Sequence, residues 1–178
     1  MKVVLDSSVL LYLVYPSAPA PIDPVSGVKV EHCEQRIEGL LEELDIRETQ
    51  IIVPTPVVSE LLIRAHDRQS EILAVLTGKK AVVVQSFDMQ AAVENAALRR
   101  SKKLIKPFGT QTKNEVRFDL QIMAIAKVCQ ADFLYTDDNN LRKRCEQAGI
   151  AVRGIGDIPV PDSKRQIGIP MEPQGEAD

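Results

Sequence analysis

Short apolar runs alternate along this chain with longer segments whose apolar residues recur at helical spacing. The short runs are rich in β-branched and other large apolar residues, which is typical of buried strands in a parallel sheet. These predicted strands cover residues 3–5, 50–53, 81–84, 133–135 and 150–152. The predicted helices cover residues 7–13, 30–44, 56–76, 88–100, 115–129 and 139–148. The alternation predicts an α/β fold of three layers, with a mostly parallel central sheet and helices on both of its faces.

Two segments carry neither pattern. Residues 15–28 hold four prolines and a glycine, which predicts an irregular insertion that serves as a lid, a partner arm or a mobile loop. From residue 159 onward the chain holds four prolines and little apolar content, so residues 159–178 are predicted to form an irregular tail. The rest of the chain, residues 1–158, is long enough for one domain with a real core.

Composition narrows the class of protein. Hydrophobic residues make up 44% of the 178 positions, but no apolar run reaches the roughly 18 residues of a membrane span. Asp6 interrupts the apolar N-terminal segment, so no signal peptide is predicted. The three cysteines, Cys33, Cys129 and Cys145, are odd in number and far apart, which favours reduced thiols. We therefore expect a cytoplasmic protein without a membrane segment.

Charge is distributed unevenly, although the net charge is only −3. Residues 1–60 hold 4 basic and 10 acidic side chains, whereas residues 61–160 hold 16 basic and 11 acidic ones. The segment 99–117 carries seven cations against one acid, Glu115. Such a run is most often a solvated face, and it contacts a polyanion only where it flanks a site. The candidate contacts for a nucleic-acid backbone in this run are Lys102, Lys103 and Lys106.

Acidic residues stand in comparable places on four predicted elements. Asp6 follows the first strand, Glu60 and Asp119 lie near the starts of helices, and Asp137 and Asp138 follow the fourth strand. Singly, each acid is explained as a helix cap or as a solvated acid near a helix N-terminus. Glu60 and Asp119, however, share helix faces with apolar residues, and buried charge is costly unless a cation compensates it.

The chemistry of these side chains points to a particular class of cation. The two histidines, His32 and His66, form no ligand spacing with the cysteines. Oxygen ligands without a histidine–cysteine cluster select a hard ion, Mg²⁺ or Mn²⁺. Carboxylates around such an ion suit phosphodiester hydrolysis, because the ion lowers the pKa of a bound water and neutralises charge on the phosphate.

Four short segments carry the acids in one order along the chain. They are VLDSSVLL (4–11), VPTPVVSELL (53–62), FDLQIMAIA (118–126) and LYTDDNNL (134–141). Together they resemble the PIN domain, a small α/β nuclease fold seen in VapC-type toxins of toxin–antitoxin pairs and in RNA-processing nucleases. The resemblance implies a PIN-like fold whose metal ligands and catalytic residues are Asp6, Glu60, Asp119 and Asp138.

The resemblance also implies supporting roles for three polar residues, Ser8, Thr136 and Asp137. Ser8 stands where the family usually has asparagine; it is shorter but still donates a hydrogen bond. Asp137 is the alternative to Asp138 as the last ligand, and Asn140 stands where a second acid is common.

These features lead to one main hypothesis of function, a Mg²⁺- or Mn²⁺-dependent endoribonuclease that leaves a 5′-phosphate and a 3′-hydroxyl and is the toxin of a toxin–antitoxin pair. Its expected partners are the RNA substrate, a cognate antitoxin and a second copy of the chain in a homodimer. One alternative is a catalytically weak PIN-like module that binds RNA or a protein. Another is a receiver domain of the response-regulator kind, in which paired acids follow the first strand; here Asp6 stands alone.

Overall fold

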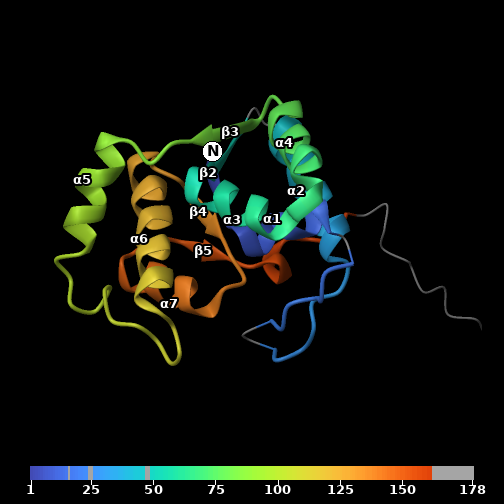
Figure 1. The fold of residues 1–178 in the computed structure, drawn as a ribbon. Coiled ribbons are helices and arrows are strands. Elements are labelled where there is room, and N and C mark those ends of the chain that lie inside the picture. The colour runs from blue at the N-terminus through green and yellow to red at the C-terminus, as the bar shows by residue number, and fades with distance from the viewer. Residues whose placement is uncertain (16, 24–25, 47–48, 162–178) are drawn as a thin grey trace, which may run out of the picture.

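Five parallel strands in the described part of the chain form one sheet (Figure 1). The structure is a computed structural model that describes residues 1–15, 17–23, 26–46 and 49–161. The order of strands across the sheet is β3-β2-β1-β4-β5. Their bounds are β1 Lys2–Leu5, β2 Gln50–Pro54, β3 Val82–Gln85, β4 Phe133–Tyr135 and β5 Val152–Arg153. The predicted parallel sheet is confirmed.

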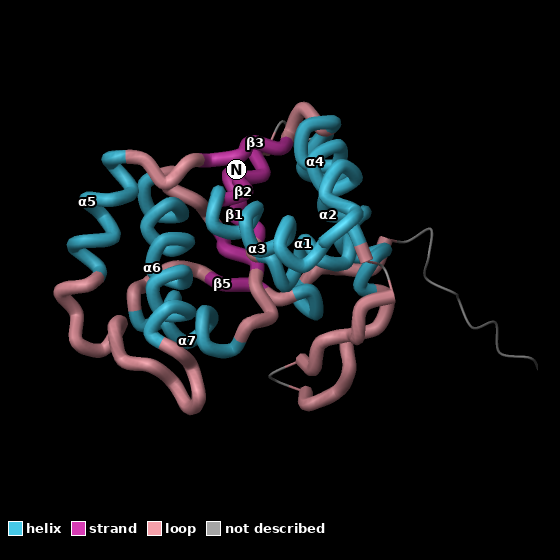
Figure 2. Tube along the Cα trace, in the orientation of Figure 1, coloured by secondary structure: helices cyan, strands magenta, loops and turns pink. Residues whose placement is uncertain are grey.

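Helices cover both faces of this sheet. They are α1 Ser7–Val14, α2 Cys33–Ile46, α3 Thr55–Ala65, α4 Gln69–Gly78, α5 Met89–Leu98, α6 Lys113–Val128 and α7 Asn139–Gln147, with 3₁₀-helices η1 His66–Arg68 and η2 Ile155–Asp157. Figure 1 shows α1 to α4 on one side of the sheet and α5 to α7 on the other, and Figure 2 shows the strands between these two layers. The three-layer α/β prediction is therefore confirmed.

The centre of the core is β1, whose apolar residues Val3, Val4 and Leu5 have no exposed surface. This burial follows from the strand's central position, because helices cover both faces and a strand pairs on each side. At the edge of the sheet, β3 leaves Val83 and Val84 37% and 43% exposed.

The chain order of the strands creates a crevice at one point of the sheet. From β1 the chain moves to β2 and β3 on one side, and it then returns to β4 and β5 on the other side. The carboxyl ends of β1 and β4 are therefore neighbours, and Asp6 N donates to Tyr135 O at 3.0 Å directly beyond them. In open α/β sheets, ligands bind at such a reversal of strand order.

Two predicted helices differ clearly from the structure. The single helix predicted over residues 56–76 is divided into α3 and α4 by the 3₁₀-helix η1. The spacing predicts a helix from residue 30, but α2 begins at Cys33. His32 has a φ of +58°, which is left-handed backbone that a right-handed helix cannot include. Val30 instead donates its N–H to Pro21 O at 2.9 Å, so it belongs to the proline-rich insertion.

The insertion predicted at residues 15–28 is irregular where it is described. One isolated bridge pairs Ile22 with Lys29, and the Tyr12 hydroxyl donates to Pro19 O at 2.7 Å, which holds the insertion against α1. Residues 16, 24 and 25 lie outside the described residues, as do residues 162–178 of the predicted tail. Within the described ranges, none of the helices combines the length and the apolar character needed to cross a membrane.

Candidate functional site

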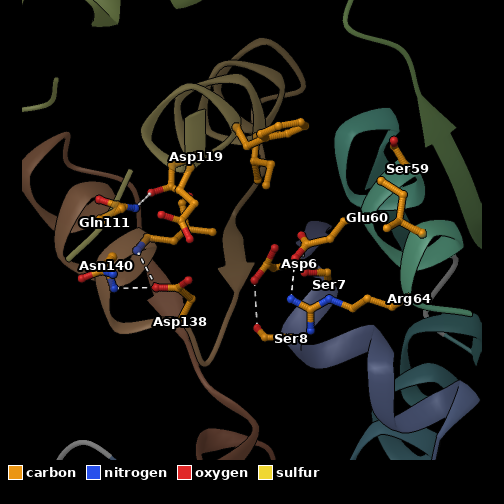
Figure 3. Close-up of a pocket in the computed structure, with 15 residues that line it drawn as sticks. Asp6, Ser7, Ser8, Ser59, Glu60, Arg64, Gln111, Asp119, Asp138 and Asn140 are labelled. Carbon is orange, nitrogen blue, oxygen red and sulfur yellow. Dashed lines mark hydrogen bonds and ion pairs between the residues drawn. The ribbon is translucent and has the colours of Figure 1, made fainter. Parts of the chain in front are cut away.

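A pocket of about 320 Å³ opens at the carboxyl edge of the sheet, and all four predicted metal ligands line it. Its walls come from the β1–α1 junction, from α3, from the start of α6 and from the β4–α7 junction. Figure 3 shows the acids facing one another across the pocket from these four places. Its lining residues include Asp6, Ser7, Ser8, Glu60, Ile63, Arg64, Gln111, Glu115, Phe118, Asp119, Ile122, Asp138 and Asn140.

Asp6 occupies the N-cap position of α1, yet its side chain does not cap the helix. Its Oδ2 atom accepts hydrogen bonds from Ser8 Oγ and Thr136 Oγ1, both at 2.8 Å. Burial raises the pKa of Asp6 and the charge of Glu60 adds to the rise, while the hydrogen bonds from Thr136, Ser8 and the Ser7 backbone oppose it. The simple explanation of Asp6 as a cap therefore fails, because its carboxylate turns to the crevice between β1 and β4.

Asp119 lies one turn further into α6 than the capping box that starts the helix, and it is buried. Its Oδ2 atom accepts from Gln111 Nε2 at 2.7 Å and from Arg144 Nε at 3.3 Å. The pKa of Asp119 is raised to about 6, chiefly by burial and also by the Asp138 charge, while the hydrogen bonds from Gln111 and Arg144 oppose the rise. A carboxylate with a raised pKa inside a pocket is typical of a functional site.

Asp138 caps α7, as the simple explanation predicts, but this role uses one oxygen only. Its Oδ1 atom accepts from the backbone N–H groups of Asn140 at 2.6 Å and Leu141 at 3.2 Å. The Oδ2 atom of Asp138 and the Oδ1 atom of Asp119 have no hydrogen-bond partner among the described residues. Each of these aspartates thus has one oxygen held in place and one available to a ligand in the pocket.

Glu60 lies on the opposite wall and has both oxygens engaged. Ser7 Oγ donates to its Oε2 at 2.7 Å, and Arg64 donates to its Oε1 at 2.6 Å from the next turn of α3. The two side chains of this ion pair are 40% and 53% exposed, so water weakens their attraction. In the arrangement described, no three His, Cys, Asp or Glu side chains among the described residues are grouped closely enough to hold a metal ion.

The predicted supporting residues divide into two groups. Ser8 and Thr136 belong to the site, because both donate to Asp6 and also accept the N–H groups of Asp137 and Asp138, each at 3.0 Å. The side chain of Asp137 does not line the pocket. Its Oδ1 accepts from Ile155 N at 3.1 Å, which turns the carboxylate toward the loop after β5.

Arg144 is the main site residue that the sequence reading missed. It is fully buried, and besides Asp119 it donates to the carbonyls of Leu104 and Lys106 and, at 2.6 Å, to Gln111 Oε1. The sequence contains a signal for its burial, since Arg144 lies on the same face of α7 as the apolar Leu141 at i−3. No role was assigned to Arg144 from the sequence.

The predicted substrate-binding lysines Lys102, Lys103 and Lys106 are exposed on the segment between α5 and α6 and do not line the pocket. Their segment is nevertheless joined to the site. Arg144 holds the backbone of the segment and Asp119 at the same time, and its guanidinium lies 4.9 Å from the centre of the Phe108 ring. The contact of these lysines with a substrate remains a prediction.

Comparison with known proteins identifies the fold. No protein-family model matches this sequence, and no curated protein matches it significantly. Among solved structures, VapBC2 from Rickettsia felis bound to a DNA fragment from their promoter aligns with a TM-score of 0.59 and 15% identity, covering 86% of this chain and 98% of that one. DNA-bound VapBC from Salmonella typhimurium aligns with a TM-score of 0.57 and 19% identity, covering 87% and 98%.

A third similar structure, FitAcB from Neisseria gonorrhoeae, has a TM-score of 0.52 and 18% identity and covers 86% of this chain and 97% of that one. The matched region in each case includes most of this chain. At these identities the similarity establishes the fold, and it confirms the PIN-domain fold predicted from the four acidic segments.

Proposed function

We propose that this protein is a Mg²⁺- or Mn²⁺-dependent endoribonuclease whose cation is held by Asp6, Glu60, Asp119 and Asp138. The observation that carries the proposal is that these acids come from four distant segments and line one pocket at the strand-order reversal. No requirement of the core brings four carboxylates together there, since like charges repel and burial raises the pKa of two of them.

The donor types fit a hard divalent cation, although a bound cation would have to draw the four carboxylates closer together than they lie in the structure. The pocket offers carboxylate oxygens, with hydroxyl groups behind them, and neither histidine nor cysteine lines it among the described residues. Ser8 and Thr136 orient Asp6, while Gln111 and Arg144 orient Asp119, as residues surrounding metal ligands commonly do. A cation would also relieve the raised pKa of the buried acids.

The reaction follows from what this pocket holds. When bound, the cation supplies an activated water molecule and neutralises charge on the scissile phosphate. Glu60 would hold the cation in place of its present partner Arg64, and the Arg64 guanidinium would then be free to bind a phosphate oxygen in the same pocket. Attack by water at phosphorus with departure of the 3′ oxygen leaves a 5′-phosphate and a 3′-hydroxyl.

The biological role that we propose is that of a toxin with a cognate antitoxin. The support is structural, because the similar proteins were solved as VapBC and FitAcB assemblies. We include a homodimer among the proposed assemblies, and we assign Lys102, Lys103 and Lys106 to contacts with RNA phosphates. A PIN-like module that binds RNA or a protein without cleaving is the second candidate, favoured by the pairing of both Glu60 oxygens.

RNA cleavage by the purified protein tests the proposal. We expect single-stranded RNA to be cut in Mg²⁺ or Mn²⁺ and left intact in EDTA, with 5′-phosphate ends on the products. Asp119→Asn should lower the cleavage rate by more than the roughly 10- to 100-fold that is typical for residues that only support a metal ligand. The matched control is Glu146→Gln, an exposed acid on α7 outside the pocket, which should cleave like the wild type. RNA that is bound but never cut would establish the second candidate instead.

A further inference from the structure

Two large apolar side chains stand exposed inside the acidic pocket. Phe118 on α6 is 48% exposed, and Ile63 on α3 is 70% exposed. Both line the same pocket as the four acids. Exposed apolar residues scattered over a surface are ordinary, but apolar residues grouped in a concave site mark a place for a ligand.

Helix geometry places these two residues beside the acids. On α6, Glu115, Phe118, Asp119 and Ile122 all line the pocket, which is the i, i+3, i+4, i+7 stripe of one helix face. On α3, Ile63 lies one turn beyond Glu60. The apolar part of the pocket is therefore continuous with its carboxylate part and belongs to the same two helices.

A nucleotide matches both parts at once. Its phosphate would bind the carboxylate-held cation and Arg64. Its base, or that of the adjacent nucleotide, would then reach the apolar wall formed by Phe118 and Ile63. Aromatic side chains bind unpaired bases by stacking, whereas bases in a duplex are already stacked on their neighbours. A pocket of about 320 Å³ takes a group of roughly nucleotide size, while a protein helix requires a longer groove.

We propose that Phe118, with Ile63 beside it, is a stacking platform for an unpaired base next to the scissile phosphate. The substrate is then single-stranded at the point of cleavage. This inference rests on the proposed nuclease function. It adds that Phe118 favours single-stranded over double-stranded RNA, a preference that the metal ligands alone do not provide.

Tryptophan fluorescence offers a direct test, because the chain contains no tryptophan. Phe118→Trp introduces a single reporter in the pocket, in a background where Glu60→Gln blocks turnover. In Mg²⁺ we expect a short single-stranded RNA to quench this fluorescence, and a duplex of the same sequence to leave it unchanged. The control reporter is Met89→Trp in the same background, at a 78% exposed position on α5 outside the pocket, where RNA should cause no quenching.

Kinetics in the otherwise wild-type protein give an independent measurement. Loss of base stacking should raise the KM of Phe118→Ala for single-stranded RNA by about 5- to 150-fold, with a smaller change in kcat. Phe118→Leu keeps apolar bulk without a ring face and should lose nearly as much, whereas Phe118→Tyr should retain a wild-type KM. RNA with an abasic nucleotide beside the cut should show the raised KM even with the wild-type protein.

The outcomes separate this inference from the proposed function. An unchanged KM in Phe118→Ala, or equal quenching by duplex and single strand, would overturn the platform and leave Phe118 to a protein partner while the nuclease stands. Quenching of the Phe118→Trp reporter by single-stranded RNA, combined with no RNA cleavage by the wild-type protein in either cation, would support the base-binding role of Phe118 and overturn the nuclease.

Discussion

Asp137 is a half-buried carboxylate whose charge is only partly compensated. Its Oδ1 accepts from Ile155 N at 3.1 Å, while its Oδ2 is buried without a hydrogen-bond partner among the described residues. Burial raises the pKa of Asp137 from 3.8 to about 6, although the Ile155 amide and Arg142 lower it. Between these two pH values the folded protein binds more protons than the unfolded chain. The free energy of unfolding therefore falls as the pH rises through this window.

Asp137→Asn should reverse this penalty. The amide keeps an acceptor for Ile155 N and carries no charge, so we expect the free energy of unfolding at pH 7.5 to rise by about 1–3 kcal/mol. The gain should shrink as the pH is lowered toward 4, where the wild-type carboxylate is protonated in the folded state and partly protonated in the unfolded chain. Urea unfolding in EDTA at pH 4.5 and 7.5 measures it, with exposed Asp67→Asn as the control. Destabilisation at pH 7.5 would show that the charge of Asp137 is needed by Arg142.

At the scale of single residues, the sequence predicted where the acids of the site lie, but not which side chains hydrogen-bond to them. Asp6 follows a strand and Asp119 lies on an apolar helix face, and both features are local in sequence. The bond from Arg144 to Asp119 spans 25 residues, and the Ser7–Glu60 bond spans 53. Only the packing of α3, α6 and α7 brings such pairs together, so no spacing rule reveals them.

Among the structural elements, the basic segment between α5 and α6 is the one whose function depends most on its anchoring. Arg144 binds the carbonyls of Leu104 and Lys106, stacks near Phe108 and holds Asp119 through the same guanidinium. A cation–carbonyl network of this kind fixes the segment relative to the pocket. The sequence predicted that the segment is basic, but not that a buried arginine from α7 supports it.

The lysines of this segment provide the element-scale prediction. We assume that Lys102, Lys103 and Lys106 each contact one RNA phosphate. Their joint replacement by alanine should then reduce the slope of the log RNA-binding constant against log salt concentration by about 2, because each contact on a single strand contributes roughly 0.7. Binding isotherms at several salt concentrations measure the slope. Lys79→Ala with Lys80→Ala is the control, because these lysines precede β3 and lie at the opposite edge of the sheet. An unchanged slope in the triple variant would remove the segment from the RNA path.

At the scale of the whole molecule, the alternation of strands and helices was sufficient to predict the layers, because each strand–helix unit buries its own apolar face. The order β3-β2-β1-β4-β5 and the crevice beside β1 required the structure, since the pattern does not state which strands are neighbours. The roles of the acids at that crevice were inferred from motif resemblance and stay a prediction, whereas the fold comparison bears on the fold alone. Their pairing with Ser7, Arg64 and Gln111 appears only in the folded chain.

The pocket joins the two helical layers, and this arrangement leads to a prediction for the stability of the entire chain. Asp6 and Glu60 are carried by β1 and α3, whereas Asp119 and Asp138 come from α6 and the start of α7. A cation held by all four ties these elements together and is lost on unfolding. Mg²⁺ or Mn²⁺ at about 100 times its Kd should then stabilise the protein by about 2.7 kcal/mol, which for 178 residues raises Tm by roughly 5–10 °C.

Thermal melts with increasing Mg²⁺, compared with Na⁺ at equal ionic strength, measure this shift in Tm. Asp138→Asn should lose most of it and Glu146→Gln should keep it; an identical shift in both variants would place the bound cation outside this pocket.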